Sequence, residues 1–300
     1  MRNKIYSYRD CSQIIFDYLQ RFLEERKGVL NSADIEPVHR MRVASRRLRA
    51  VLNVFKRILP VKKTKIWTRE ISKIGQVLGV ARQLDVQIKF LKSAKNRLKN
   101  NPGFFYTGVI IKSLQQKRSL AQKQINLALG NFEIKENLPE LSACLKKLSS
   151  GKHMRFFGES SLLDSRIILK RLDKLLEFVS YVSKPQDIKR LHRMRIAAKK
   201  LRYTLEIYRF RYGARFDKYI RASRDIQDLL GDLHEFDCLS EALSDFLKKS
   251  NRDFKDTVLN LMQECARRRQ IVYINFVRLW NFLEKTQMWI KLRKEFSTGI

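Results

Sequence analysis

Glycine, proline and cysteine are all scarce in this sequence of 300 residues. Glycine occurs 11 times and proline 5 times, mainly between long segments with helical periodicity. Because these two residues interrupt helices, their scarcity favours an all-helical protein with short connections. The 4 cysteines lie far apart and form no CxxC pair, so we expect free thiols in a reducing cytoplasm and no metal site.

Long apolar runs are also missing. No window approaches the roughly 18 apolar residues that a membrane-spanning helix needs, so we expect no membrane partner. The first residues, MRNKIYSYRDCSQ, contain no apolar stretch of the kind found in signal peptides. Apolar residues nevertheless make up 44% of the chain and alternate with charged ones throughout. The sequence therefore predicts a folded cytoplasmic protein with a substantial core.

Familiar catalytic motifs are absent as well. The sequence contains no GxxxxGK phosphate loop, no HExxH and no glycine-rich dinucleotide turn. We therefore expect no catalytic residues and no cofactor, and we interpret the chain as a binding protein rather than an enzyme. Asp85 and Asp237 are matched carboxylates, which we interpret as structural salt bridges or caps.

Acidic residues are outnumbered about two to one. The chain holds 63 Lys+Arg against 30 Asp+Glu, which gives a formal net charge of +33. Basic residues are in excess in both halves, so the charge is not a basic tail on a neutral domain. An excess of this size repels itself in a compact protein, and it predicts an anionic partner.

The periodic segments predict two sets of four helices. The expected segments are 5–27, 37–60, 62–100 and 104–129, a connector at 130–158, and then 160–182, a helix that starts at Pro185, 214–249 and 251–286. We expect an all-α fold of two four-helix bundles, residues 1–150 and 151–300, that arose by internal duplication. A pseudo-twofold axis would relate them, with a basic groove or pore between them.

The duplication is predicted from a repeated basic segment. Residues 39–55 read HRMRVASRRLRAVLNVF, and residues 192–208 read HRMRIAAKKLRYTLEIY. Further along each half, Leu78-Gly79 precedes Asp85 as Leu230-Gly231 precedes Asp237. Matching motifs in the same order indicate repeated units. Each glycine is expected to mark a bend or a close approach between helices.

On a helix, the repeated segment separates its basic and apolar residues. Met41, Leu48 and Leu52 form an apolar stripe for the core. A basic stripe runs beside it, and further apolar residues flank its other edge, as expected for the lining of a groove. The basic stripes consist of His39, Arg42, Arg46 and Arg49 in the first copy, and of His192, Arg195, Lys199 and Arg202 in the second.

Cations at every turn over roughly 15 Å suit a linear polyanion better than one small anion. Arginine also offers a planar fork to phosphate oxygens and stays charged when partly desolvated. Neighbouring arginines should lower the pKa of each stripe histidine, and bound phosphate should raise it. Three further matched pairs are candidate ligands: Arg40 and Arg193, Arg69 and Arg221, and Arg118 and Arg268. Glu206 lies on the second stripe, where we expect it to pair internally with Arg202.

The paired H-x-x-R-[VI]-x-x-[KR]-[KR]-L-R motifs, His39 to Arg49 and His192 to Arg202, resemble the CHAD family, the conserved histidine α-helical domain. The likeness extends over about residues 5–285. It implies two four-helix bundles around a central basic pore that binds inorganic polyphosphate through the motif residues. In some members it also implies association with polyphosphate granules. Some relatives carry a CYTH triphosphatase domain, but this sequence has no β-rich segment for one.

Nucleic-acid binding is the main alternative, because the charge and the helix content also fit it. Against it, the sequence shows no helix-turn-helix, and its aromatic residues keep core spacing rather than forming a stacking platform. A third possibility is an anion-bridged scaffold for protein partners. The sequence predicts neither an oligomeric state nor a preferred polyphosphate chain length.

Overall fold

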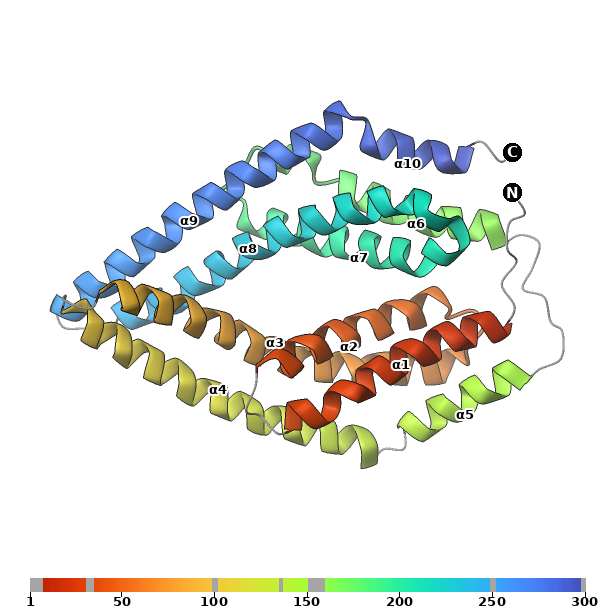
Figure 1. Ribbon diagram of the computed structural model, residues 1–300, viewed down its shortest axis with the longest axis horizontal. Coiled ribbons are helices and arrows are strands. Elements are labelled where there is room, and N and C mark those ends of the chain that lie inside the picture. Colours follow the sequence, from red (N-terminus) through yellow and green to blue (C-terminus); the bar gives the residue numbers. More distant parts are fainter. Residues whose placement is uncertain are drawn as a thin grey trace. The chain divides into compact units, whose positions relative to one another are not determined.

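A computed structural model describes residues 8–30, 35–98, 102–134, 137–150, 160–248 and 252–297. Within these ranges the regular structure is entirely helical, with ten α-helices, two short 3₁₀ helices and no strand (Figure 1). The α-helices are α1 (Tyr8–Leu30), α2 (Glu36–Val54), α3 (Val61–Arg97), α4 (Gly103–Ile134), α5 (Asn137–Ser150), α6 (Ser160–Leu176), α7 (Ile188–Tyr212), α8 (Asp217–Leu247), α9 (Arg252–Lys285) and α10 (Met288–Ser297). The all-α prediction is confirmed.

Two helices were not expected. Helix α5 lies inside the predicted connector, and α10 follows the last predicted helix. Each is short and is held by burial of a few apolar side chains. Leu141 and Leu145 of α5 are buried, and α5 packs against α1. Trp289 and Leu292 of α10 are buried, and α10 packs against the end of α9. The prediction of four helices in each half is therefore corrected to five.

The chain forms two compact units. Unit 1 comprises Met1–Lys92 and Ile111–Ser160, and unit 2 comprises Ser93–Ile110 and Ser161–Ile300. The last residues of α3 and the first residues of α4 thus belong to unit 2. The expected division into domains 1–150 and 151–300, and their origin by internal duplication, stay predictions.

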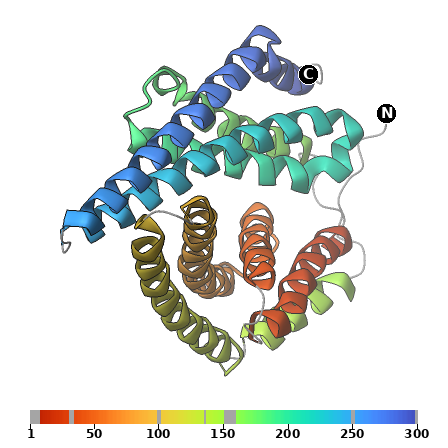
Figure 2. The ribbon, with the colours of Figure 1, turned by 60° about the vertical axis from the view of Figure 1, so that its left-hand side comes forward.

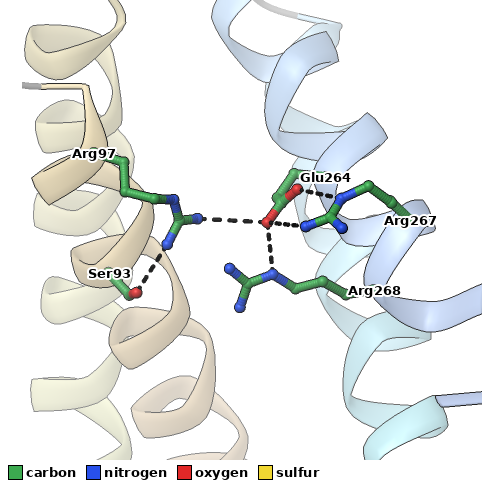
Figure 3. A network of polar contacts seen from close by, with 5 residues as sticks. All are labelled: Ser93, Arg97, Glu264, Arg267 and Arg268. Carbon is green, nitrogen blue, oxygen red and sulfur yellow. Dashed lines mark hydrogen bonds and ion pairs between the residues drawn. The ribbon is translucent and has the colours of Figure 1, made fainter. Parts of the chain in front are cut away.

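Polar and aromatic contacts attach the end of α3 and the start of α4 to α9. Tyr106 of α4 packs edge to face on Phe254, with ring centroids 5.5 Å apart. The Nη2 atom of Arg97, at the end of α3, lies 3.6 Å from a carboxylate oxygen of Glu264. Figure 3 shows that Arg267 and Arg268 converge on the same carboxylate, with Nε distances of 3.0 and 2.6 Å. Hydrogen bonds from Arg267 and Arg268 lower the pKa of Glu264 to about 2.

In each unit the helix with the basic stripe packs on a long neighbour. Helix α2 contacts α1, and α7 contacts α8, which itself runs alongside α9 (Figure 2). Met41, Leu48 and Leu52 of α2 are fully buried, so the apolar stripe predicted from the sequence is confirmed. Burial of side chains of this size contributes about 1.5–3 kcal/mol each. The apolar side of α2 thereby fixes which residues face away from the core.

The matched glycines mark close contacts rather than bends, because α3 and α8 continue through them. A Cβ added at Gly79 would lie 3.5 Å from Nε of Arg42, and one added at Gly231 would lie 3.7 Å from Nε of Arg195. Each stripe arginine therefore lies across the backbone of the next helix. The repetition of this contact supports the duplication, which stays a prediction.

None of the helices in the described part of the chain combines the length and the apolar character needed to cross a membrane.

Candidate functional site

The basic side chains of the α2 stripe are partly exposed to solvent. His39, Arg42, Arg46 and Arg49 are each half-buried, while the opposite side of the helix lies in the core. Pro37, in the first turn of α2, starts the helix without loss of a hydrogen bond, since the N–H groups of that turn have no partner within the helix. The stripe is therefore held on a rigid element whose other face is fixed by packing.

Three nitrogens of this stripe are buried and have no hydrogen-bond partner among the residues that the structure describes: Nδ1 of His39, Nε of Arg46 and Nε of Arg49. Burial also lowers the pKa of Arg49. An unsatisfied buried polar group costs about 1–3 kcal/mol, and more when it is charged. The protein therefore retains on α2 a row of donors that a nearby anion would stabilise.

The pKa of His39 is lowered, first by burial and then by the charges of Arg82, Arg46 and Arg42, against an opposing effect of Glu36. The predicted direction is confirmed, although burial is the larger cause. An anion beside the stripe would oppose both effects and favour the imidazolium form.

Helix α7 carries the second stripe at the same depth, with His192, Arg195, Lys199 and Arg202 half-buried. Its electrostatic surroundings differ from those of α2. Arg202 donates from Nε to Glu206 at 2.8 Å, so the predicted internal pair is confirmed. The same carboxylate lies 4.0 Å from Arg224 of α8. The end of the α7 stripe is thus neutralised within the protein.

At the start of the α7 stripe, two imidazole rings face each other. Nδ1 of His192 lies 3.3 Å from Nδ1 of His234, and Cys238 lies within 3.7 Å of the His234 ring. Burial lowers the pKa of His192, as do Arg195 and Lys199, while Asp237 raises it. His234 lies three residues after Gly231, as Arg82 lies three residues after Gly79, and its contact with His192 was not predicted from the sequence. No group of three or more potential metal ligands occurs in the part of the chain that the structure describes.

The apolar flanks differ between the two stripes. Val43 and Ala50, beside the α2 stripe, are half-buried. Tyr203 and Ile207, beside the α7 stripe, are 6% and 4% exposed and belong to the core. The end of the α7 stripe near Arg202 therefore lies between two packed edges, whereas Ile196, near its start, is half-buried like Val43.

Arg118 does not belong to a stripe. Its Nε donates to Asp85 at 2.8 Å, and the two side chains are 14% and 3% exposed. In unit 2 the matching partner of Asp237 is Arg269, at 2.5 Å, rather than Arg268. The structural interpretation of both carboxylates is confirmed. The two arginines are not equivalent, because Arg268 donates to Glu264. The part of Arg118 and Arg268 in anion binding stays a prediction.

The other candidate cations lie in exposed positions. Arg40 donates to Glu25 of α1 at 2.8 Å, so its side chain is directed toward that helix. Arg69 lies beside Glu70 at 3.2 Å and is largely exposed. Arg193 and Arg221 are exposed as well. The half-buried sets on α2 and α7 are thus distinct from these surface arginines, whose part in binding stays a prediction.

Comparison with known proteins identifies one family. A family model described as CHAD domain matches residues 13–244, well over half of the chain. The crystal structure of the CHAD domain from the plant Ricinus communis is similar, with a TM-score of 0.64 and 18% identity, over 100% of this chain and 96% of that one. PptA from Streptomyces chartreusis is also similar, with a TM-score of 0.65 and 14% identity, over 92% of this chain and 99% of that one. At these identities the two structures share the fold alone. No curated protein matches the chain.

Proposed function

Because the chain belongs to the CHAD domain family, we propose that it binds inorganic polyphosphate along the basic stripes of α2 and α7. The observation that carries the proposal is the row of buried, unpartnered nitrogens of His39, Arg46 and Arg49. Charged donors of this kind are costly to leave unsatisfied, and phosphate oxygens accept short, strong hydrogen bonds from them.

The spacing of the cations supports a chain of phosphates over a single one. His39 and Arg49 are ten residues apart, which corresponds to roughly 15 Å along the helix. Arg42 and Arg46 divide this length, so a cation recurs about once per turn. A linear polyanion with closely spaced charges would meet several of them in one extended conformation. The shared groove that the sequence predicts for the two stripes stays a prediction.

We propose binding without catalysis. The matched carboxylates Asp85 and Asp237 are each held by an arginine, as expected for structural residues. We further propose that the protein acts in the cytoplasm, where association with polyphosphate granules would follow from its affinity for the polymer.

Nucleic-acid binding remains the alternative function, since a basic stripe also suits a sugar-phosphate backbone. The positions of the aromatic residues favour polyphosphate. Trp67, Tyr219 and Trp280 are buried, and the exposed Phe105 and Phe282 lie on α4 and α9 rather than beside a stripe. Binding of single-stranded nucleic acid usually relies on aromatic side chains that stack with the bases.

The test is a calorimetric titration with short, intermediate and long polyphosphate chains at one fixed salt concentration. We expect the affinity to rise with chain length. Arg46→Gln/Arg49→Gln should lower it at least about tenfold, since each hydrogen bond to a charged group contributes about 1.5–3 kcal/mol. Lys174→Gln/Lys248→Gln removes the same charge from two exposed surface pairs and is the matched control.

Competition then separates the functions. Polyphosphate should displace duplex DNA from the protein at equal phosphate concentration and equal salt. Tighter binding of DNA than of long-chain polyphosphate would refute the proposal, and so would equal losses in the stripe variant and the control. A protein complex that survives removal of polyphosphate would instead support the scaffold alternative.

A further inference from the structure

The two basic stripes differ at their C-terminal ends. Four residues after Arg49, α2 carries Asn53, whose side-chain amide donates to the Arg49 carbonyl oxygen at 2.7 Å. Asn53 thus contacts the backbone. Four residues after Arg202, α7 carries Glu206, which accepts from the Arg202 guanidinium at 2.8 Å. Corresponding positions therefore hold a neutral amide in one copy and a carboxylate ion pair in the other.

The N-terminal ends differ in the same direction. Arg82 of α3 lies close enough to His39 for its permanent charge to lower the histidine pKa. In the second copy the corresponding residue is His234, which lies beside His192. An acidic residue opposes the lowering of the histidine pKa in both copies, Glu36 in the first and Asp237 in the second, so the contrast lies in Arg82 against His234. Both ends of the α7 stripe are thus less positive than the ends of the α2 stripe.

From these two contrasts we infer that α2 is the main polyphosphate-binding stripe and that Glu206 is the specificity-determining residue that restrains α7. The inference rests on the proposed function and deepens it by ranking the two stripes. Arg202 and Glu206 are 13% and 14% exposed, so their attraction is only partly screened by solvent. A phosphate must therefore displace an established carboxylate to reach Arg202, whereas no carboxylate of the described residues accepts a hydrogen bond from Nε of Arg49.

Glu206 also discriminates between ligands. A weakly charged or short anion gains too little from Arg202 to displace the carboxylate, and it is left with α2 alone. A long polyphosphate can remain bound to Arg195 and Lys199 on the same helix while its further phosphates compete for Arg202 at a high effective concentration. The restrained stripe thus favours long chains.

Substitution of Glu206 by asparagine and of Asn53 by glutamate tests this inference. Glu206→Asn should tighten the binding of short-chain polyphosphate about tenfold and reduce the preference for long chains. Asn53→Glu should place a carboxylate beside Arg49 and weaken binding of both lengths by a similar factor, as expected for the gain or loss of one charged hydrogen bond. Asp245→Asn and Gln115→Glu, at exposed positions of α8 and α4, change the net charge by the same amounts and are the controls.

A second comparison uses the arginines themselves. Arg49→Gln should reduce the affinity at least about tenfold more than Arg202→Gln at the same salt concentration. Thermal melting verifies that each variant is folded, and Glu206→Gln replaces Glu206→Asn if the latter loses its cooperative transition. Equal losses of affinity in Arg49→Gln and Arg202→Gln would overturn the inference, and so would an unchanged affinity on removal of the Glu206 charge. In either case, binding by the wild-type protein would still support the proposed function. Absence of wild-type polyphosphate binding would overturn both.

Discussion

Removal of Arg118 tests the distinction between structural and ligand-binding arginines. Asp85 is 3% exposed, and Arg118 is its partner at 2.8 Å. Burial raises the pKa of Asp85, and Arg118 is the main group that opposes this effect. Arg118→Leu would leave a buried carboxylate without its counter-charge, which costs about 3–5 kcal/mol. We expect a loss of stability of this size at pH 7.

The pH dependence of this loss follows from the raised pKa. In the variant, the folded state would bind a proton at Asp85 more tightly than the unfolded state does, so stability falls as pH rises through the folded pKa. The loss should therefore be smaller at pH 5 than at pH 7, because protonation removes the buried charge. Asp85→Asn/Arg118→Leu should recover much of the stability at both values.

Urea denaturation, followed by the fluorescence of a tryptophan in unit 1, measures the loss of stability in Arg118→Leu. Trp67 is buried there, whereas Trp280 and Trp289 belong to unit 2, so a Trp280→Phe/Trp289→Phe background leaves Trp67 as the reporter. Polyphosphate affinity of the Arg118 variant should change less than about threefold under conditions where it is folded, a difference of less than about 1 kcal/mol. A loss of stability below about 1 kcal/mol, or one that is equal at pH 5 and pH 7, would refute the reasoning.

Three further outcomes are expected. Because the pKa values of His39 and His192 are lowered in the free protein and phosphate favours the imidazolium, polyphosphate affinity should rise from pH 8 to pH 6 at fixed salt. A flat profile, or one that persists in His39→Gln/His192→Gln, would contradict this role. The pKa of Glu264 is lowered to about 2 in the folded protein. Its ionised carboxylate therefore stabilises the protein at a pH above its pKa in the unfolded chain, and this stabilisation is lost as the pH falls toward the folded pKa. Glu264→Gln should therefore lower stability by about 1 kcal/mol at pH 7 after allowance for solvent screening, and by less at pH 3, as measured by thermal melting. Gly79→Ala should stabilise the protein by about 0.5–1 kcal/mol, since the added Cβ would meet Arg42 at an ordinary contact distance of 3.5 Å inside a helix; a lower melting temperature would contradict the observed clearance.

Local sequence signals predicted the long helices and the stripes, because both depend on periodicity along one segment. The segment expected at 62–100 forms α3 as Val61–Arg97, and the α2 stripe faces away from the core as its spacing requires. Helices α5 and α10 were missed as separate elements because short helices depend on tertiary burial. Their buried leucines and tryptophan acquire partners only when the chain has folded.

Contacts between distant segments could not be predicted from periodicity. From the sequence, Arg118 and Arg268 are both candidate ligands of the basic groove. The structure shows that Asp85 binds one, from 33 positions away in the chain, and that a neighbouring Glu264 binds the other. The Arg202–Glu206 pair was predictable because the two residues are four positions apart on one helix. Sequence reasoning therefore identifies cations reliably but cannot tell which of them have already been neutralised.

The distribution of carboxylates links stability to binding in this chain. A net charge of +33 repels itself, and acidic residues relieve that repulsion only where they lie close to cations. In unit 2, Glu206, Asp237 and Glu264 each accept a hydrogen bond from at least one arginine, and Glu206 lies on the stripe itself. In unit 1, Asp85 accepts from Arg118, and Nε of Arg46 and Nε of Arg49 have no carboxylate partner within the described ranges. Two basic helices of similar sequence can thus differ in the placement of acids around them, and we expect the helix whose cations lack a carboxylate partner to bind an anion more tightly at the expense of its own stability.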